Sequence, residues 1–137
     1  IEACIAAHGL GGRVMLLGHR DDVPRIIRTA DVYVSSSWSE GLGTSILEAL
    51  ACGTPVVATQ AGGAAEMVRP GETGWLVRVR DAEAIAAAVL ECLRDRARAR
   101  AMAEQGRALV EAEFTAERMV ERTLAVYAAL LHEDDTD

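Results

Sequence analysis

The chain has 137 residues, a length that fits one domain. Half of its residues are hydrophobic and 26% are charged, as in ordinary soluble globular proteins, and no run approaches the roughly 20 apolar residues of a membrane span. The net charge is −7, and all 14 basic residues are arginines. This acidic balance argues against a nucleic-acid partner, which needs a basic surface. The bias toward arginine and alanine is typical of a GC-rich bacterial genome.

The ends and the cysteines bear on the protein's location. Because the first residue is isoleucine, we expect the natural protein to begin upstream, so the lack of a targeting segment says nothing about the whole protein. Cys4, Cys52 and Cys92 form no C-x-x-C pair, which disfavours a zinc site or a disulfide framework. We therefore expect reduced, buried cysteines in a cytoplasmic protein.

The first half of the chain alternates between strand and helix patterns. Three apolar runs predict strands that are buried on both faces, at 13–18, 31–37 and 54–59. Helical spacing or helix-ending signals predict helices at 1–8, 22–29 and about 45–52. The second of these helices is expected to begin at Asp22, before Pro24. This alternation predicts an α/β fold with a parallel sheet and helices on its faces.

The second half is helical after a short strand predicted around Trp75–Val77. Asp81 is the expected N-cap of a helix whose apolar stripe comprises Ala82, Ile85, Ala86, Val89, Leu90 and Leu93. A second helix is predicted over about 97–112, after the run RDRARARA, which we interpret as a solvated helix junction. A third begins at Thr115, with Phe114 and Met119 as a hydrophobic staple. Its stripe comprises Val120, Leu124, Tyr127 and Leu131, and the acidic tail 132–137 is expected to fray.

One segment, residues 39–68, carries a glycine-rich loop that leads from a predicted strand into a helix. Ligands of open parallel sheets lie beyond the carboxyl ends of the strands. Gly41 and Gly43 would let backbone amides approach a ligand, and the helix dipole would favour an anion such as phosphate. The loop is not a P-loop, because no Gly-Lys-Ser/Thr follows. It also lacks the dinucleotide fingerprint, because Ile46 stands where the third glycine belongs.

Two acids, Glu40 and Glu48, flank this loop with seven residues between them. A carboxylate does not help to bind phosphate, but it accepts strong hydrogen bonds from sugar and ribose hydroxyls. Simpler interpretations remain open for each feature. Glu48 and Ser45 match a capping box, Glu40 fits a solvated loop acid, and Gly62 with Gly63 fits an ordinary turn.

Together these pieces resemble the family 4 glycosyltransferases over residues 13–131. The matching motifs are the E-x7-E pair followed by ACGTPVVAT, then GETGWLV and FTAERMVERTLAVYAAL. The resemblance implies a partial Rossmann-like parallel sheet with flanking helices, the carboxy-terminal donor-binding domain of a GT-B fold, over 1–131. It also implies the strand order 3-2-1-4-5-6, with the first two strands and an amino-terminal acceptor domain lying outside the 137 residues.

The resemblance assigns roles to individual residues. Glu40 would bind hydroxyls of the donor sugar as the catalytic residue, and Glu48 would bind the ribose. The diphosphate and sugar would meet the backbone of Gly41, Leu42, Gly43 and Thr44, with Ser45 at the helix start. The base pocket would involve Gly18, His19 and Arg20, although an ordinary surface charge is the alternative for Arg20.

The implied reaction transfers a sugar from a nucleotide-diphosphate donor to an acceptor hydroxyl with retention of the anomeric configuration. No metal and no cofactor are expected. The acceptor class is open between a glycan, a lipid and a small molecule, and contact with a membrane surface would involve the missing half. We expect the isolated chain to be inactive and, because sheet edges lie exposed, poorly stable. A cooperative thermal melt with a high midpoint would contradict the second expectation.

Rival functions are a GT-B-type epimerase or phosphorylase, and a non-catalytic binding or scaffold subunit. The E-x7-E pair favours the transferase over the first two. The retained loop glycines argue against a decayed scaffold. A nicotinamide-dependent enzyme is disfavoured, because the third glycine and a later ribose-binding acid are absent from the pattern.

Overall fold

The computed structural model describes residues 1–133, with side chains described as far as residue 131. Its sheet consists of the parallel strands β1 (Tyr33–Ser35), β2 (Val56–Thr59) and β3 (Trp75–Val77), in the order β1-β2-β3. In the register, Tyr33 lies opposite Val56, and Val57 lies opposite Trp75. The predicted parallel α/β sheet is therefore confirmed, and its three strands follow one another as the last three do in the implied order.

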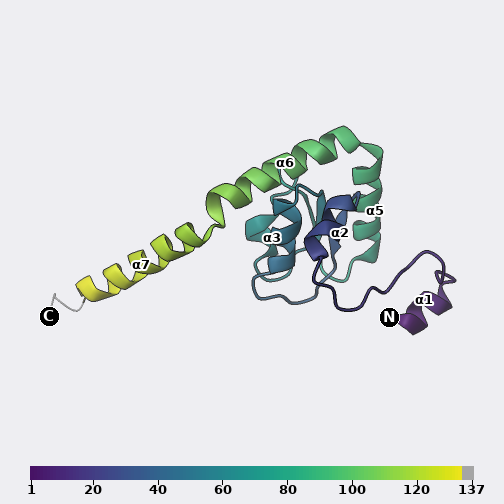
Figure 1. Cartoon of the computed structure of the whole chain (residues 1–137), viewed down its shortest axis with the longest axis horizontal. Helices are drawn as coiled ribbons and strands as arrows, with labels where there is room; N and C mark the ends of the chain where they lie inside the picture. The colour runs from purple at the N-terminus through teal and green to yellow at the C-terminus, as the bar shows by residue number, and fades with distance from the viewer. Residues whose placement is uncertain (134–137) are drawn as a thin grey trace.

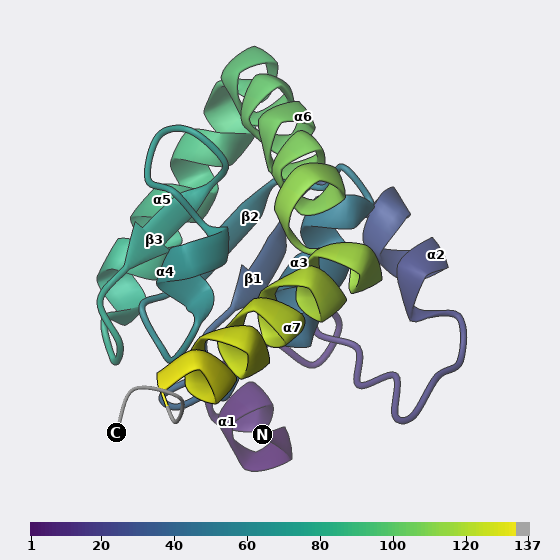
Figure 2. The same cartoon turned by 90° about the vertical axis from the view of Figure 1, so that its left-hand side faces the viewer.

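The helices cover both faces of this sheet. They are α1 (Glu2–Ala7), α2 (Val23–Thr29), α3 (Thr44–Ala51), α4 (Ala64–Met67), α5 (Ala82–Arg94), α6 (Arg96–Glu113) and α7 (Ala116–Glu133). Helices α3 and α5 lie on opposite sides of the sheet, and α6 contacts both of them (Figure 2). Helices α1 and α7 instead extend away from this body in opposite directions (Figure 1).

The central strand β2 holds the two halves of the core together. All four of its side chains are buried, because both faces of the sheet are covered. Val56 and Ala58 pack with Ile46 and Leu50 of α3, whereas Val57 points to the other face. The cluster on that second face also contains Trp75, Ala88, Cys92, Ala99 and Met102. Burial raises the pKa of the Cys92 thiol.

Two of the predicted helix starts are confirmed by the hydrogen bonds at their caps. The Asp81 carboxylate accepts from the Ala84 amide at 2.8 Å, and the Thr115 hydroxyl accepts from the Arg118 amide at 3.2 Å. Helix α2 also begins after Asp22, but the Asp22 side chain makes no capping bond. The predicted junction after α5 is sharp, since Asp95 both ends α5 and caps α6.

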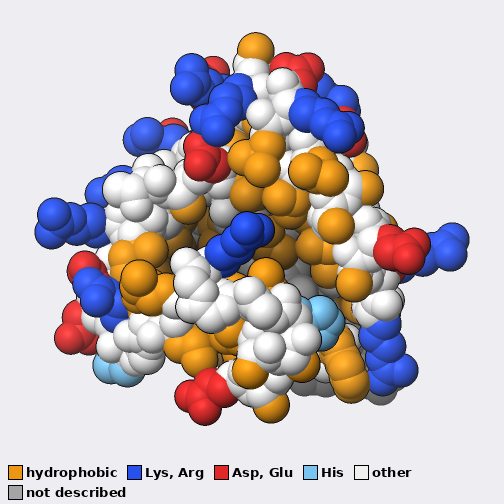
Figure 3. Space-filling view, turned by 90° about the vertical axis from the view of Figure 1, so that its right-hand side faces the viewer, with side chains coloured by type: hydrophobic (Ala, Val, Ile, Leu, Met, Phe, Trp, Pro, Cys, Tyr) orange, Lys and Arg blue, Asp and Glu red, His pale blue; other side chains and the backbone are white. Residues whose placement is uncertain are grey.

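The strand predicted at 13–18 is not formed. These residues have no regular structure, and Val14, Met15, Leu16 and Leu17 are 42–79% exposed. A segment becomes a strand only by pairing its backbone, and within residues 1–133 β1 pairs with β2 alone. The apolar run therefore lies unpaired. Figure 3 shows the side of the molecule that lies on the right in Figure 1, and hydrophobic side chains gather across the middle of that face.

Two predicted apolar stripes and one cysteine also differ from expectation. In α5 the predicted Ile85 and Val89 are partly buried against the core, but the fully buried residues are Ala88 and Cys92. The predicted Leu90 and Leu93 are 49% and 37% exposed. The whole predicted stripe of α7 is exposed, because α7 contacts the body only near its start (Figure 1). Cys4 is exposed rather than buried, and all three cysteines are free.

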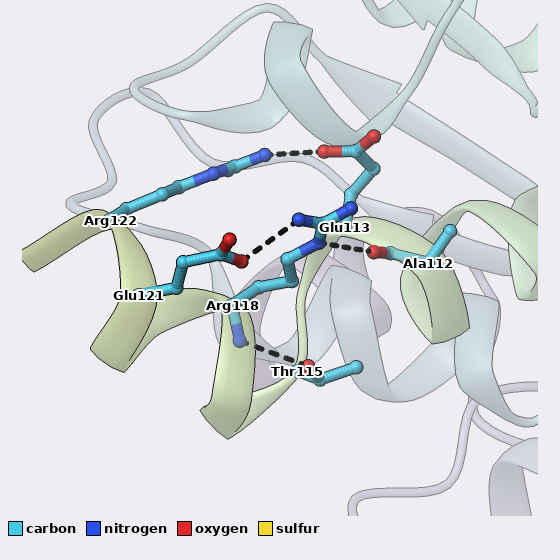
Figure 4. Close-up of polar contacts among 6 residues, drawn as sticks. All are labelled: Ala112, Glu113, Thr115, Arg118, Glu121 and Arg122. Atoms are coloured by element: carbon cyan, nitrogen blue, oxygen red, sulfur yellow. Dashed lines mark hydrogen bonds and ion pairs between the residues drawn. The ribbon is translucent and has the colours of Figure 1, made fainter. Parts of the chain in front are cut away.

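Polar contacts bind the start of α7 to the end of α6. Arg118 donates to the Ala112 carbonyl at 3.4 Å, and Arg122 pairs with Glu113 (Figure 4). Within α7, Arg118 also donates to Glu121 at 2.9 Å. Phe114 and Met119, the predicted staple, line one hollow. Helix α7 continues to Glu133, so residues 132 and 133, which were predicted to fray, are helical. The rest of the predicted tail, 134–137, lies outside the described residues.

Candidate functional site

The candidate loop begins where β1 ends, and β2 holds it in place. The buried Thr59 hydroxyl lies 2.6 Å from the Ser37 carbonyl and 3.3 Å from the Ser35 carbonyl, both of which accept from it. Ser37 in turn donates its hydroxyl to the Glu40 carboxylate at 2.7 Å. Glu40 is half-buried. It is therefore not the freely solvated loop acid of the simpler interpretation, because a neighbouring side chain fixes its carboxylate.

The glycine pair before α4, Gly62 and Gly63, lies against the backbone of the candidate loop. A β-carbon on Gly62 would lie 2.0 Å from the Glu40 carbonyl oxygen, and one on Gly63 would lie 3.2 Å from the Leu42 carbonyl oxygen. The Gly63 amide donates to the Gly41 carbonyl at 3.1 Å. The pair is thus more than an ordinary turn, since only glycine at 62 permits this approach.

Gly41 and Gly43 serve different purposes. Gly41 is exposed, and a β-carbon there would meet nothing within 4 Å. Gly43 is buried under Met67 and Ile46, adopts φ 76°, and is the N-cap of α3. Its glycine is needed for the left-handed turn that starts the helix, rather than for the close ligand approach that we expected.

Glu48 lies farther along α3 than a capping box with Ser45 would place it. It is the fifth residue of the helix, in the second turn rather than the first, and its side chain is exposed. The capping-box alternative is wrong, because Gly43 is the N-cap and no side chain bonds to the cap. Glu48 is therefore available to a ligand on the α3 side of the loop.

A largely apolar hollow of about 300 Å³ joins the start of α3 to the amino-terminal segment. It brings together Gly18, Arg20 and Ser45, three of the predicted donor-binding residues. Its remaining lining is apolar or aromatic: Leu17, Val23, Ile26, Ile27, Ala30 and Tyr33. Apolar walls with a few polar groups are typical of small-ligand sites.

His19 and Arg20 were both predicted for the base pocket, but only Arg20 lines the hollow. His19 has a 93% exposed side chain, 3.4 Å from Asp21, and it does not line the hollow. Arg20 donates two hydrogen bonds of 2.7 Å to Asp22, and this pairing holds the pKa of Asp22 below its usual value. The Arg20 guanidinium is thus paired with a neighbouring acid, while the residue also lines the hollow.

Sequence reasoning missed the partners that come from distant parts of the chain. Ser37 and Gly62 hold the loop, and Trp38 stacks with Arg80 near its start. Only Gly62 gave a signal, as part of a glycine pair. Among the described residues, no three His, Cys, Asp or Glu side chains cluster as a metal site, and none of the helices searched is long and apolar enough to cross a membrane.

A parallel sheet with a glycine-rich, helix-starting loop at its carboxyl edge defines an α/β protein whose candidate loop lies where such open sheets bind their ligands. Comparison with known proteins makes this specific. The chain belongs to the glycosyl transferases group 1 family, whose sequence profile matches residues 1–109.

Related sequences and structures agree with this assignment. The chain is 39% identical, over 96% of its length and 37% of the relative, to the lipopolysaccharide core biosynthesis mannosyltransferase LpcC of Rhizobium leguminosarum bv. viciae. It is 34% identical, over 89% of its length and 32% of the relative, to N-acetyl-alpha-D-glucosaminyl L-malate synthase of Bacillus anthracis. A crystal structure of Anabaena HepE in complex with UDP matches with a TM-score of 0.87 and 29% identity, covering 93% of this chain and 35% of that one.

These matches confirm both the resemblance to GT-B glycosyltransferases and the fold class. Both relatives are named as enzymes, one as a mannosyltransferase of lipopolysaccharide core biosynthesis and the other as a synthase. The chain spans about a third of the length of the curated relatives it matches, 32% of one and 37% of another.

Proposed function

We propose that this chain forms the donor-binding part of an enzyme that transfers a sugar from a nucleotide diphosphate to an acceptor hydroxyl, with retention. The observation that carries the proposal is the loop 40–45, fixed by Ser37 and backed by Gly62, with an acid on either side. HepE, a structural neighbour, was crystallised with UDP and with UDP-glucose, which supports a nucleotide-sugar ligand.

Each part of the loop has a task in this proposal. The exposed turn at Gly41 and the first amides of α3 would bind the diphosphate, because they lie at the positive end of the helix dipole. Such fixed donors would also stabilise charge on the leaving diphosphate. Glu40 would accept bonds from sugar hydroxyls, and Glu48 from the ribose. The hollow beside Ser45 would take the base.

Calorimetry on the 137-residue chain, with EDTA present, tests the binding roles. Removing an ionised acceptor should weaken binding roughly tenfold. Glu48→Gln should weaken UDP or GDP as well as their sugars, because both carry the ribose. Glu40→Gln should weaken only the nucleotide sugars. Glu2→Gln is the matched control, since Glu2 is exposed on α1, away from the sheet (Figure 1).

The outcomes separate the rival functions. Absence of nucleotide binding by the chain would contradict the donor-binding role. With a full-length parent protein, sugar transfer that yields an inverted anomer by NMR would contradict retention. Epimerised or phosphorolysed donor would favour the epimerase or phosphorylase. A parent that binds nucleotide sugars but turns none over with glycan, lipid or small-molecule acceptors would favour the scaffold.

A further inference from the structure

Trp38 presents a large aromatic surface to solvent beside the candidate loop. Its side chain is 69% exposed, whereas the other tryptophan, Trp75, is 9% exposed in the core. Tryptophan is a highly buried residue on average, so this exposure is unusual. The Arg80 guanidinium carbon lies 4.3 Å from the indole centroid. A cation at this distance covers one face of the ring, which leaves the other face available and limits its rotation.

Arg80 holds this position in an unfavourable backbone conformation. With φ 62°, it is the one non-glycine residue with positive φ among residues 1–133. A β-carbon disfavours this region, and residues kept there often lie at functional sites. Glycine would adopt the conformation without strain, but it could not stack on the indole. The contact with Trp38 is thus the clearest use of a side chain at position 80.

The pair also lies at the edge of the sheet where a ligand is expected. Trp38 follows β1, Arg80 follows β3, and β2 lies between these two strands. Their contact therefore spans the carboxyl edge of the sheet. Ser37, the residue before Trp38, donates to the Glu40 carboxylate at 2.7 Å. The indole and this carboxylate thus belong to one short, fixed stretch of chain.

We propose that Trp38 forms a wall of the sugar subsite and stacks its open face on the C–H face of the donor's hexose ring. The proposal rests on the proposed function. A pyranose offers hydroxyls around its rim and C–H bonds on its faces, so it fits an acid for the rim and an aromatic plane for the face. Trp38 is a specificity-determining contact, and Arg80 is a positioning residue that acts through it. The apolar hollow at Ser45 serves the base instead.

The experiment compares nucleotide sugars with the nucleotides alone. Calorimetry on the 137-residue chain would use UDP-glucose and GDP-mannose against UDP and GDP. Trp38→Ala is expected to weaken the better-binding nucleotide sugar roughly tenfold, as happens when other aromatic stacks are removed, and to leave the nucleotide unchanged. Trp38→Phe keeps an aromatic plane and should recover most of the affinity. Equal loss for both ligands, or no loss, overturns the proposal.

Two further measurements separate positioning from a structural role. Arg80→Gly relieves the backbone strain, so the free energy of unfolding should stay the same or rise, yet nucleotide-sugar affinity should fall severalfold. Arg78→Ala, two residues earlier and also exposed, is the control. Tryptophan emission should shift with the nucleotide sugar in the wild type but not in Trp38→Phe. Unchanged affinity in Arg80→Gly overturns the role of Arg80, and failure of every nucleotide to bind overturns the proposed function itself.

Discussion

Two regions of the molecule are rich in apolar residues but bury them very differently. One is the body, the sheet with the helices packed on it; the other is the two arms, which are residues 1–18 and helix α7. Ile46 and Leu50 of α3 are at most 1% exposed, because β2 and α6 cover them. In the arms, Met15 is 79% exposed and Leu124 is 59% exposed. An apolar pattern thus predicts which face of a helix or strand can be buried. Whether that face is buried depends on another element packing against it.

Identical substitutions in the two regions give the largest expected contrast. Leu50→Ala removes a fully buried side chain and should lower the free energy of unfolding by about 2–5 kcal/mol, because it leaves a cavity between α3, α6 and β2. Leu124→Ala should change it by less than about 0.5 kcal/mol, since an exposed side chain leaves no cavity. Urea denaturation of both variants measures the contrast. Similar losses would mean that α7 is packed against the chain in solution.

Two glycines with similar backbone angles test whether the donor loop depends on a close approach. Gly62 has φ +53° and would place a β-carbon 2.0 Å from the Glu40 carbonyl oxygen, whereas Gly53 has φ +69° and open space. Alanine at either site costs about 1–2 kcal/mol for the left-handed conformation alone. Gly62→Ala should cost about 1–3 kcal/mol more, because the loop must move.

Ligand binding provides a second test of the same pair. Gly62→Ala should also weaken nucleotide-sugar binding, since the displaced backbone belongs to Glu40 and Gly41. Gly53→Ala should leave the affinity unchanged. Denaturation and calorimetry on both variants give the two values. Equal stability losses together with equal affinities would show that the loop does not need Gly62 behind it.

Local signals in the sequence predicted most of the fold. Asp81 and Thr115 start helices as expected, because a cap acts on amides only a few residues away. The strand at 13–18 could not be decided in this way, since it requires a partner from elsewhere. The α5 stripe was only partly right for the same reason: Ile85 and Val89 pack against the core as predicted, but which apolar side of a largely apolar helix is buried depends on the elements that pack against it.

The sequence predicted the motif of the candidate site, but not the contacts from distant residues that hold the loop in place. The E-x7-E spacing and the loop glycines single out residues 40–48 from the sequence. The contact of Trp38 with Arg80 joins residues 42 positions apart, and that of Gly62 with Glu40 joins residues 22 apart. No local pattern encodes such pairs, so they emerge only when the strands are placed side by side.

A smaller loss of stability is expected when a helix cap, one of the local signals in the sequence, is removed. Asp95→Ala removes the carboxylate that accepts from the Arg98 amide at 3.0 Å and that starts α6 where α5 ends. The expected loss in the free energy of unfolding is about 1 kcal/mol. Asp21→Ala, at an exposed loop position, is the control and should have almost no effect. A loss no larger than the control's in urea denaturation would mean that the packing of α6 on its neighbouring helices holds it without this cap.

The smallest effect is expected in the unpaired apolar segment, and it bears most directly on the difference between body and arms. Met15→Gln and Leu16→Gln replace side chains that are 79% and 51% exposed, so each should change the free energy of unfolding by less than about 0.5 kcal/mol. Self-association, measured by sedimentation, should fall, because exposed apolar runs promote contacts between molecules. The same replacement at the buried Val57 is the matched control and should unfold the chain. If Met15→Gln instead destabilised the chain by more than about 1 kcal/mol, residues 13–18 would be packed in solution. The apolar pattern, rather than the exposure, would then describe this segment correctly.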